Sequence, residues 1–185
     1  MTLGRARLFA ALELPPPIRT TLVRWHRAQL GVLDGLRGVD AEALHVTLCF
    51  LGSQPVQQIE AIASACRTLA CEPPVPLSMG EPRWLPPRRP RVLAIGLRDD
   101  ERRLAATQSL LSQALQTGGW YEPERPFLGH VTLARSAGGS RVRPIELSPP
   151  AAAPFSVTAV ALLRSHLGRP GARYERLARV RLKGK

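Results

Sequence analysis

The chain carries one hexapeptide twice: residues 45–50 read HVTLCF, and residues 130–135 read HVTLAR. Four of the six positions are identical. Both copies fall in short apolar runs of the kind that form β-strands. Each copy follows a predicted helix, which itself follows a predicted strand. The repeat therefore predicts two lobes with the same order of elements, related by a pseudo-twofold axis.

The alternation of a strand divides the side chains of each copy between two faces. Side chains at positions i and i+2 share a face, so His45 and Thr47 point one way while the apolar residues between and after them point into a core. Phe50 shares its side with Leu48 and is expected in that core. His130 and Thr132 repeat the pattern. Two such pairs across one cleft would surround a small anion with two imidazoles and two hydroxyls.

The rest of the chain predicts an α+β fold, because runs of strands occur without strict strand–helix alternation. We expect antiparallel sheets around a central cleft, helices on the outside, and one bilobal domain over residues 1–185. The proline- and arginine-rich segment 82–90 and the segment 31–38 read as loops. Helices are predicted from about residues 18, 55 and 100. Strands are predicted over residues 7–14, 44–51, 75–84, 91–97, 127–135, 155–163 and 174–182, with a weaker signal near 142–147.

The paired polar groups suit phosphodiester chemistry. Opening a cyclic phosphate needs a base that takes a proton from water and an acid that protonates the departing ribose oxygen. Histidine titrates near a pKa of about 6.5, so one imidazole can be neutral while the other is protonated. Threonine hydroxyls can donate to the non-bridging oxygens as charge develops. One HxT alone would be read as a strand with its polar side chains outward, but two copies in matching contexts favour a site.

Composition supports an anionic partner. The formal net charge is +12, and lysine occurs only at positions 183 and 185, so arginine carries nearly all of the positive charge. Arginine binds phosphate in bidentate fashion and favours RNA or nucleotide ligands. The three cysteines include no C-x-x-C spacing, so we expect neither a metal nor another cofactor. Apolar runs are too short for a signal peptide or a membrane span, which predicts a cytoplasmic protein. We also expect a monomer.

The two motifs resemble the paired H-x-T-x motifs of the two-histidine phosphoesterase superfamily. The resemblance is greatest to the bacterial and archaeal RNA 2′,3′-cyclic phosphodiesterases, also called LigT-like 2′–5′ RNA ligases. It extends to RLFAAL at residues 7–12, PRVL at 90–93 and the hairpin around residues 165–174. Ala10 departs from the pattern, since relatives often carry a second aromatic residue there, and we expect this to bear on base contacts.

This resemblance implies a bilobal α+β fold with both histidines in a central cleft. It further implies that His45 is the proton donor and His130 the proton acceptor. Thr47, Thr132 and Arg135 would bind the phosphate. The expected activity is metal-independent hydrolysis of RNA 2′,3′-cyclic phosphate ends to 2′-phosphates, with reversible 2′–5′ ligation as a related reaction.

Two alternatives remain open at this point. The same groups would serve a cyclic phosphodiesterase that acts on small nucleotides or on 2′–5′ oligonucleotides. A protein of another class, a non-catalytic RNA-binding module, would explain the charge equally well. Binding alone does not require two imidazoles, so the intact motif pair argues for catalysis.

Overall fold

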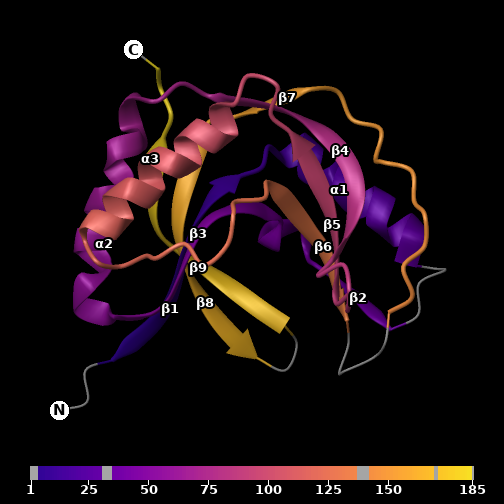
Figure 1. Cartoon of the computed structure of the whole chain (residues 1–185), viewed down its shortest axis with the longest axis horizontal. Coiled ribbons are helices and arrows are strands. Elements are labelled where there is room, and N and C mark those ends of the chain that lie inside the picture. The colour runs from indigo at the N-terminus through magenta and orange to yellow at the C-terminus, as the bar shows by residue number, and fades with distance from the viewer. Residues whose placement is uncertain (1–3, 31–34, 137–141, 169–170, 185) are drawn as a thin grey trace.

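The computed structural model describes residues 4–30, 35–136, 142–168 and 171–184, and it confirms the α+β class. Nine strands form a curled, antiparallel sheet in the order β7-β4-β5-β6-β3-β1-β8-β9, with β2 paired to β6 (Figure 1). The elements are β1 (Arg5–Glu13), α1 (Pro16–Leu30), β2 (Leu36–Gly38), η1 (Ala41–Ala43), β3 (His45–Pro55), η2 (Val56–Gln58), α2 (Ile59–Cys66), η3 (Arg67–Cys71), β4 (Val75–Leu85), β5 (Val92–Arg98), α3 (Arg103–Thr117), β6 (His130–Ser136), β7 (Phe155–Val157), β8 (Ala159–Gly168) and β9 (Gly171–Arg181).

The two motif strands, β3 and β6, are neighbours at the centre of this sheet. They pair antiparallel through Val46 and Val131, which hold the same position in the two copies of the hexapeptide. The order read outward from this pair is β3-β1-β8 on one side and β6-β5-β4 on the other. The sheet therefore has the pseudo-twofold arrangement that the repeat predicts.

The helices cover this sheet in a crossed manner. Helix α1 follows β1 in the chain but contacts β6 and β2, whereas α3 follows β5 and contacts β3 and α2. In Figure 1, α2 and α3 accordingly lie at one side of the sheet and α1 at the other. Each half of the sequence thus supplies the helix that covers the motif strand of the other half.

Helix α3 shows how the sequence fixes these elements locally. Leu104, Leu111 and Leu115 recur at helical spacing and are fully or nearly fully buried, and each such side chain contributes on the order of 2 kcal/mol of burial free energy. The carboxylate of Asp99 accepts hydrogen bonds from the amides of Leu104 (3.0 Å) and Ala105 (2.9 Å), which caps the first turn as expected.

A β-bulge interrupts β3 directly after its HxT. The register runs from Ala11↔Thr47 to Ala10↔Cys49, so Leu48 is an extra residue without a partner on β1. Leu48 and Cys49 are consequently both buried, and the alternation resumes with the opposite parity. Phe50 therefore lies on the same face as the histidine, 46% exposed, and the expectation that it belongs to the core is wrong.

Strand β6 carries the same bulge at the equivalent place. Its register runs from Ala94↔Thr132 to Leu93↔Ala134, which leaves Leu133 without a partner on β5. Leu133 and Ala134 are both buried, and Arg135 is exposed on the face of the HxT pair. The sixth position of both hexapeptides thus points to the same face as the first and the third.

Several boundaries differ from the sequence-based prediction. Part of the expected loop 31–38 is strand β2, because Arg37 pairs with Arg135 at the margin of β6; residues 31–34 lie outside the described part. Strand β6 begins at His130 instead of residue 127. Strand β3 continues beyond Gly52, whose positive φ of 67° accommodates a second irregularity in the pairing with β1.

Residues 142–147 form no strand, although the sequence suggested one. Two indoles hold this segment instead: Nε1 of Trp84 donates to the carbonyl of Ile145 (2.9 Å), and Nε1 of Trp25 donates to that of Ser148 (3.1 Å). The third tryptophan, Trp120, donates to the side chain of Gln58 (3.2 Å) near α2. Within the described ranges, no helix is long and apolar enough to cross a membrane.

Candidate active site

The four polar side chains of the two HxT pairs lie together on one face of the central strand pair. Antiparallel pairing at Val46 and Val131 places His45 beside Thr132 and Thr47 beside His130, because neighbours of an antiparallel pair lie opposite one another. His130 lies close enough to His45 for its charge to lower the pKa of His45. The structure therefore brings both histidines and both threonines into one group.

Both imidazoles are held by the same backbone contact. Nδ1 of His45 lies 2.7 Å from the carbonyl oxygen of Ala43, and Nδ1 of His130 lies 2.8 Å from that of Leu128. A carbonyl oxygen only accepts, so Nδ1 is the protonated nitrogen in each ring and Nε2 is left for chemistry. In His45, Nε2 lies 3.0 Å from Oγ1 of Thr47.

His45 is enclosed by aromatic rings. Its ring centroid lies 4.9 Å from that of Phe9 and 5.2 Å from that of Tyr174, and the latter meets it edge-on. Burial lowers the pKa of His45 to about 4, although the bond to Ala43 opposes this, and the charges of Arg135 and His130 lower it further. His45 is therefore neutral in the empty cleft at physiological pH.

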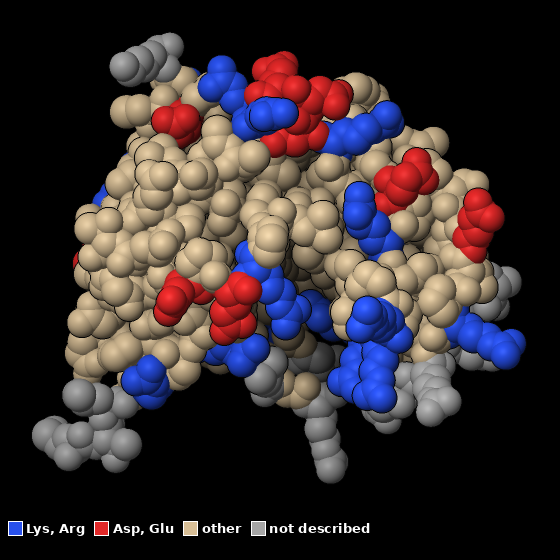
Figure 2. All heavy atoms as spheres, in the orientation of Figure 1, with Lys and Arg blue, Asp and Glu red and all other residues tan. Residues whose placement is uncertain are grey.

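A cavity of about 420 Å³ opens on this face and brings His45 and Thr47 together with Arg135 and Phe50. The guanidinium carbon of Arg7 lies 4.6 Å from the centroid of the Phe50 ring, a cation–π contact that steadies the ring at the cavity wall. Ala10 is fully buried and does not line this cavity, and a bearing of this position on base contacts stays a prediction. Figure 2 shows basic side chains beside the recess near the middle of the face in view.

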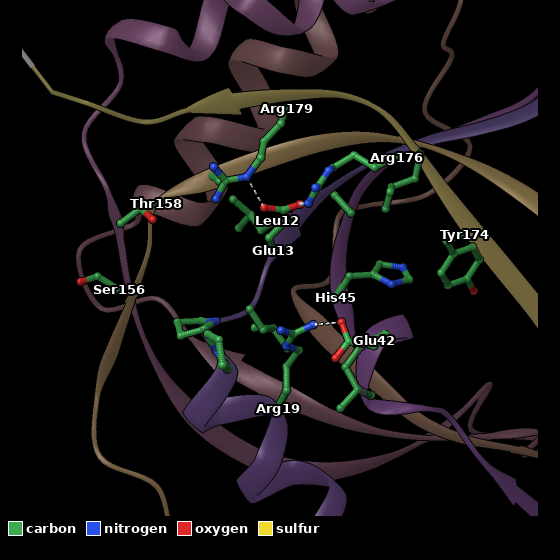
Figure 3. A pocket seen from close by; sticks show the side chains of 17 residues that line it. Leu12, Glu13, Arg19, Glu42, His45, Ser156, Thr158, Tyr174, Arg176 and Arg179 are labelled. Carbon is green, nitrogen blue, oxygen red and sulfur yellow. Dashed lines mark hydrogen bonds and ion pairs between the residues drawn. The ribbon is translucent and has the colours of Figure 1, made fainter.

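Two further cavities adjoin the first one. Tyr174 lines all three. One, of about 500 Å³, contains Arg135 and Arg173. The other, of about 600 Å³, contains His45 and a set of arginine–glutamate pairs (Figure 3). His45, Thr47 and Arg135 therefore each line at least one of three adjoining cavities, whereas His130 and Thr132 line none of them.

Metal ligands do not gather in the part of the chain that the structure describes: no three His, Cys, Asp or Glu side chains come together there as a metal site would need. The cysteines at the bulge and on α2 are buried among apolar residues. Burial raises the pKa of the Cys49 thiol to about 12 and that of Cys66 to about 11, so both stay protonated.

Sequence reasoning missed two features of this site. Phe50 was assigned to the core because strict alternation was assumed, although both hexapeptides break their alternation with two successive apolar residues at the same point. Tyr174, some 130 residues from His45 in the chain, comes beside it through the pairing of β9 with β8 and of β8 with β1. The first feature had a signal in the repeat, whereas the second depends on tertiary structure.

Known proteins resemble this chain over nearly its whole length. The family model described as the 2′-5′ RNA ligase superfamily matches residues 8–169. A protein of Escherichia coli (strain K12) named RNA 2′,3′-cyclic phosphodiesterase is 30% identical over 175 residues, which cover 94% of each chain. A protein of the same name from Thermus thermophilus is 31% identical, over 96% of this chain and 91% of its own length.

Solved structures agree with these relatives. The crystal structure of Escherichia coli LigT complexed with 3′-AMP superposes with a TM-score of 0.83 at 30% identity, covering 97% of this chain and 99% of that one. The crystal structure of the Thermus thermophilus protein TT0787 gives a TM-score of 0.79 at 28% identity, with the same coverage. With a matching family model, relatives at about 30% identity and a shared fold, the chain belongs to the 2′-5′ RNA ligase superfamily.

Proposed function

We propose that this chain hydrolyses RNA 2′,3′-cyclic phosphate ends to 2′-phosphates, with the whole chain acting as one catalytic unit. The observation that carries the proposal is the pair of equivalent imidazoles on adjacent strands, each held through Nδ1 by a backbone carbonyl. Two Nε2 atoms are thereby prepared for proton transfer around one cleft that also holds two threonine hydroxyls and an arginine. The names of the curated relatives support the same reaction.

In the proposed mechanism, His130 accepts a proton from water through Nε2 as the water oxygen bonds to phosphorus. The bond from phosphorus to the ribose 3′ oxygen breaks, and His45 donates its Nε2 proton to that oxygen. The product is a 2′-phosphomonoester with a free 3′-hydroxyl. Arg135, with Thr47 and Thr132, stabilises the charge on the non-bridging oxygens.

Because the pKa of His45 is low, the proposed mechanism needs the substrate to promote protonation of this ring. At neutral pH the empty cleft holds a neutral His45, which cannot act as an acid. A phosphodiester anion beside the ring favours the protonated imidazole and raises its pKa. Substrate binding would therefore charge the proton donor.

Phe50 gives the cavity a surface for a nucleobase. Because of the bulge, Thr47 and Phe50 lie opposite Ala11 and Phe9, which are two residues apart on β1. At the usual rise of a strand this is a span of roughly 7 Å, which is the scale of one nucleoside. An exposed aromatic ring stacks on any base without reading its sequence. We infer that the phosphate lies between the HxT pairs while the base of the same nucleotide lies on Phe50.

The direct test is a product assay with an oligonucleotide that ends in a 2′,3′-cyclic phosphate. We expect a 2′-phosphate product, and we expect the rate to persist in excess EDTA because the mechanism routes no step through a metal. A 3′-phosphate product would reverse the roles of the two ribose oxygens. Loss of activity on chelation, restored by a divalent metal, would contradict the two-histidine mechanism. Binding without any turnover would favour the non-catalytic RNA-binding module.

A further inference from the structure

The cavity of about 600 Å³ beside His45 has features that hydrolysis of a cyclic phosphate does not use. It lies between the end of β1, the start of α1 and strand β9, and Figure 3 shows polar side chains from these elements turned towards one space. His45 and Tyr174 line this cavity and the 420 Å³ cavity as well. The two spaces therefore adjoin at the proton donor.

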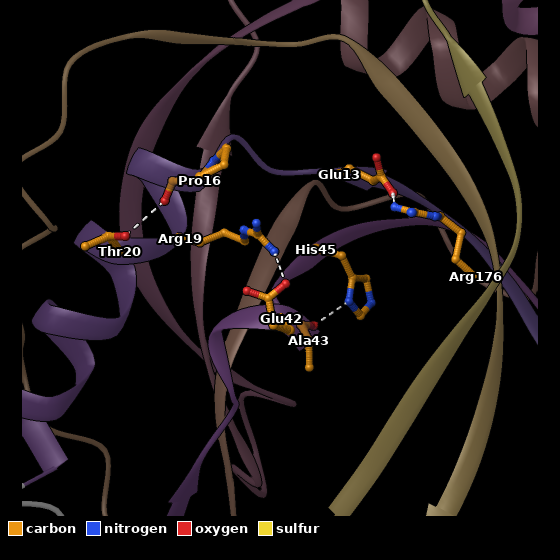
Figure 4. A network of polar contacts seen from close by, with 8 residues as sticks. All are labelled: Glu13, Pro16, Arg19, Thr20, Glu42, Ala43, His45 and Arg176. Carbon is orange, nitrogen blue, oxygen red and sulfur yellow. Dashed lines mark hydrogen bonds and ion pairs between the residues drawn. The ribbon is translucent and has the colours of Figure 1, made fainter.

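Three guanidinium groups face this space. Arg176 and Arg179 both contact Glu13, at 3.0 and 2.6 Å, and Arg19 contacts Glu42 at 2.7 Å (Figure 4 shows the Arg176 and Arg19 contacts). Three arginines face two glutamates, so the lining keeps a net positive charge. Each guanidinium uses only part of its five donors on its carboxylate, and the remainder are available to an anion.

The two ion-pair groups differ in strength. The Glu42 side chain is 86% exposed, so its pair with Arg19 is screened by water and contributes little. Glu13 is more enclosed: partial burial raises its pKa, but hydrogen bonds from Arg179 and Arg176 outweigh this and hold the pKa below its usual value. Glu13 also lies directly opposite His45 in the register of β1 and β3, so this pair of arginines is anchored next to the catalytic candidate.

We propose that this cavity binds a second nucleotide, the one joined to the nucleotide that carries the reacting phosphate, and that Arg176, Arg179 and Arg19 hold its phosphodiester group. Leu163, which is partly exposed, adds an apolar part to the wall, which suits a sugar or a base. This inference rests on the proposed function and deepens it, because it assigns the preference for RNA over a cyclic mononucleotide to named residues.

Two substrates place a second nucleotide beside the same phosphate. One is an RNA end, in which the preceding nucleotide of the same strand is the neighbour. The other is a 2′–5′ linkage, in which the neighbour belongs to the strand that leaves or joins through its 5′-hydroxyl. Both present one more phosphodiester or nucleoside, and the experiment below distinguishes them.

The test compares substrates of different length on matched variants. A nucleoside 2′,3′-cyclic phosphate reports on the catalytic centre, a cyclic-phosphate-ended dinucleotide adds the preceding nucleotide, and a 2′–5′ dinucleotide carrying a 5′-phosphate adds the other neighbour. For Arg176→Gln and Arg179→Gln, we expect the ratio of kcat/KM for a dinucleotide to that for the mononucleotide to fall about tenfold, as for the loss of a hydrogen bond to a charged group.

Arg103→Gln is the control, since it removes an equally positive but exposed side chain from α3, away from all three cavities. Its ratio should stay within twofold. A fall with the cyclic-ended dinucleotide assigns the cavity to the same strand, and a fall with the 2′–5′ dinucleotide assigns it to the other. Unchanged ratios with both dinucleotides would overturn the proposal, whereas absence of mononucleotide turnover by the unsubstituted chain would overturn the proposed function instead.

A second variant keeps the proposal testable if loss of an arginine disturbs folding. Glu13→Gln leaves both guanidinium groups in place and removes the charge that they share. If the cavity binds a phosphodiester, the dinucleotide-to-mononucleotide ratio should rise by at least twofold. If the arginines only anchor β9, the ratio should stay the same while thermal stability falls, and that result would contradict a binding role.

Discussion

The two halves of the candidate active site share a backbone arrangement and differ in their surroundings. In each half, a carbonyl two residues before the histidine fixes Nδ1, and a bulge after the HxT turns the sixth side chain to the cleft. The ring of His45 is enclosed by Phe9 and Tyr174, with Glu13 opposite it on β1. In the proposed mechanism, the repeated backbone positions the two Nε2 atoms that exchange protons, and the different neighbours make one histidine the donor and the other the acceptor.

The surroundings of His130 are more open. The residue opposite it on β5 is Gly96, the counterpart of Glu13. Nε of Arg83 lies only 2.7 Å from the place that a Cβ of this glycine would occupy, so a cation lies beside the position that Glu13 holds in the other half. The sixth positions differ as well, because one half ends in Phe50 and the other in Arg135. The two equivalent strands thus carry different groups at the same place: an aromatic ring, Phe50, on β3 and a cation, Arg135, on β6.

Removing either imidazole tests the comparison most severely. We expect His45→Ala and His130→Ala each to lower the single-turnover rate by about 10² to 10⁴, with the double variant losing far less than the product of the two because the pair acts as a unit. Circular dichroism and thermal melting would establish that the variants fold. A folded single variant with near-full turnover would show that the two halves are not partners.

Substitutions at the sixth positions of the two hexapeptides, Phe50 and Arg135, should affect different substrates. Arg135→Gln removes a donor to phosphate and should cost about 10- to 100-fold with every cyclic phosphate. Phe50→Ala removes a stacking surface and should cost roughly tenfold, but only when the substrate has a base. A cyclic phosphate on an abasic sugar is the discriminating substrate for both variants.

Ile145→Ala is the matched control for this pair, since it removes a comparably exposed apolar side chain, 41% accessible, from outside the cavities. It should leave both substrates unaffected. If Phe50→Ala slowed the abasic and the nucleoside substrates equally, Phe50 would support the fold of the cleft and would have no contact with the base.

The pH profile should show the unequal surroundings directly. In the free enzyme, the low-pH limb of kcat/KM should lie near 4, the pKa of His45, with a tenfold loss per pH unit below it as the pair becomes doubly protonated. In the substrate complex, the phosphate stabilises the charged ring, so the same limb of kcat should move to higher pH. NMR titration of the His45 ring, with and without inorganic phosphate, measures the shift without turnover, and equal values would refute it.

The threonines should give the smallest effects. Thr47→Val and Thr132→Val each remove one neutral hydroxyl and should slow hydrolysis about 2- to 10-fold. Thr47 also contacts Nε2 of His45 in the empty site, so its substitution alone should alter the chemical shifts of the His45 ring. A loss as large as that of a histidine variant would assign a threonine a direct part in proton transfer.

The sequence predicts much of this molecule because its signals are local or repeated. The strand periodicity of the two hexapeptides, an aspartate cap on α3 at residue 99 or 100 and the pseudo-twofold arrangement follow from short-range pattern and internal symmetry. Ideal strand alternation does not predict the bulges, after which the side chains point to the opposite faces. Strand β2 forms only because the edge of β6 is available to pair with it. The neighbours of His45 also come from three strands that are distant in the sequence, so their packing could not be foreseen.

The placement of the three tryptophans has an experimental use. Trp25 and Trp84 hold the segment around residues 145–148, while Trp120 lies beside α2. Variants that retain a single indole would therefore report fluorescence from one side of the sheet or the other. Such reporters would show whether the two sides close on a bound nucleotide together or one after the other.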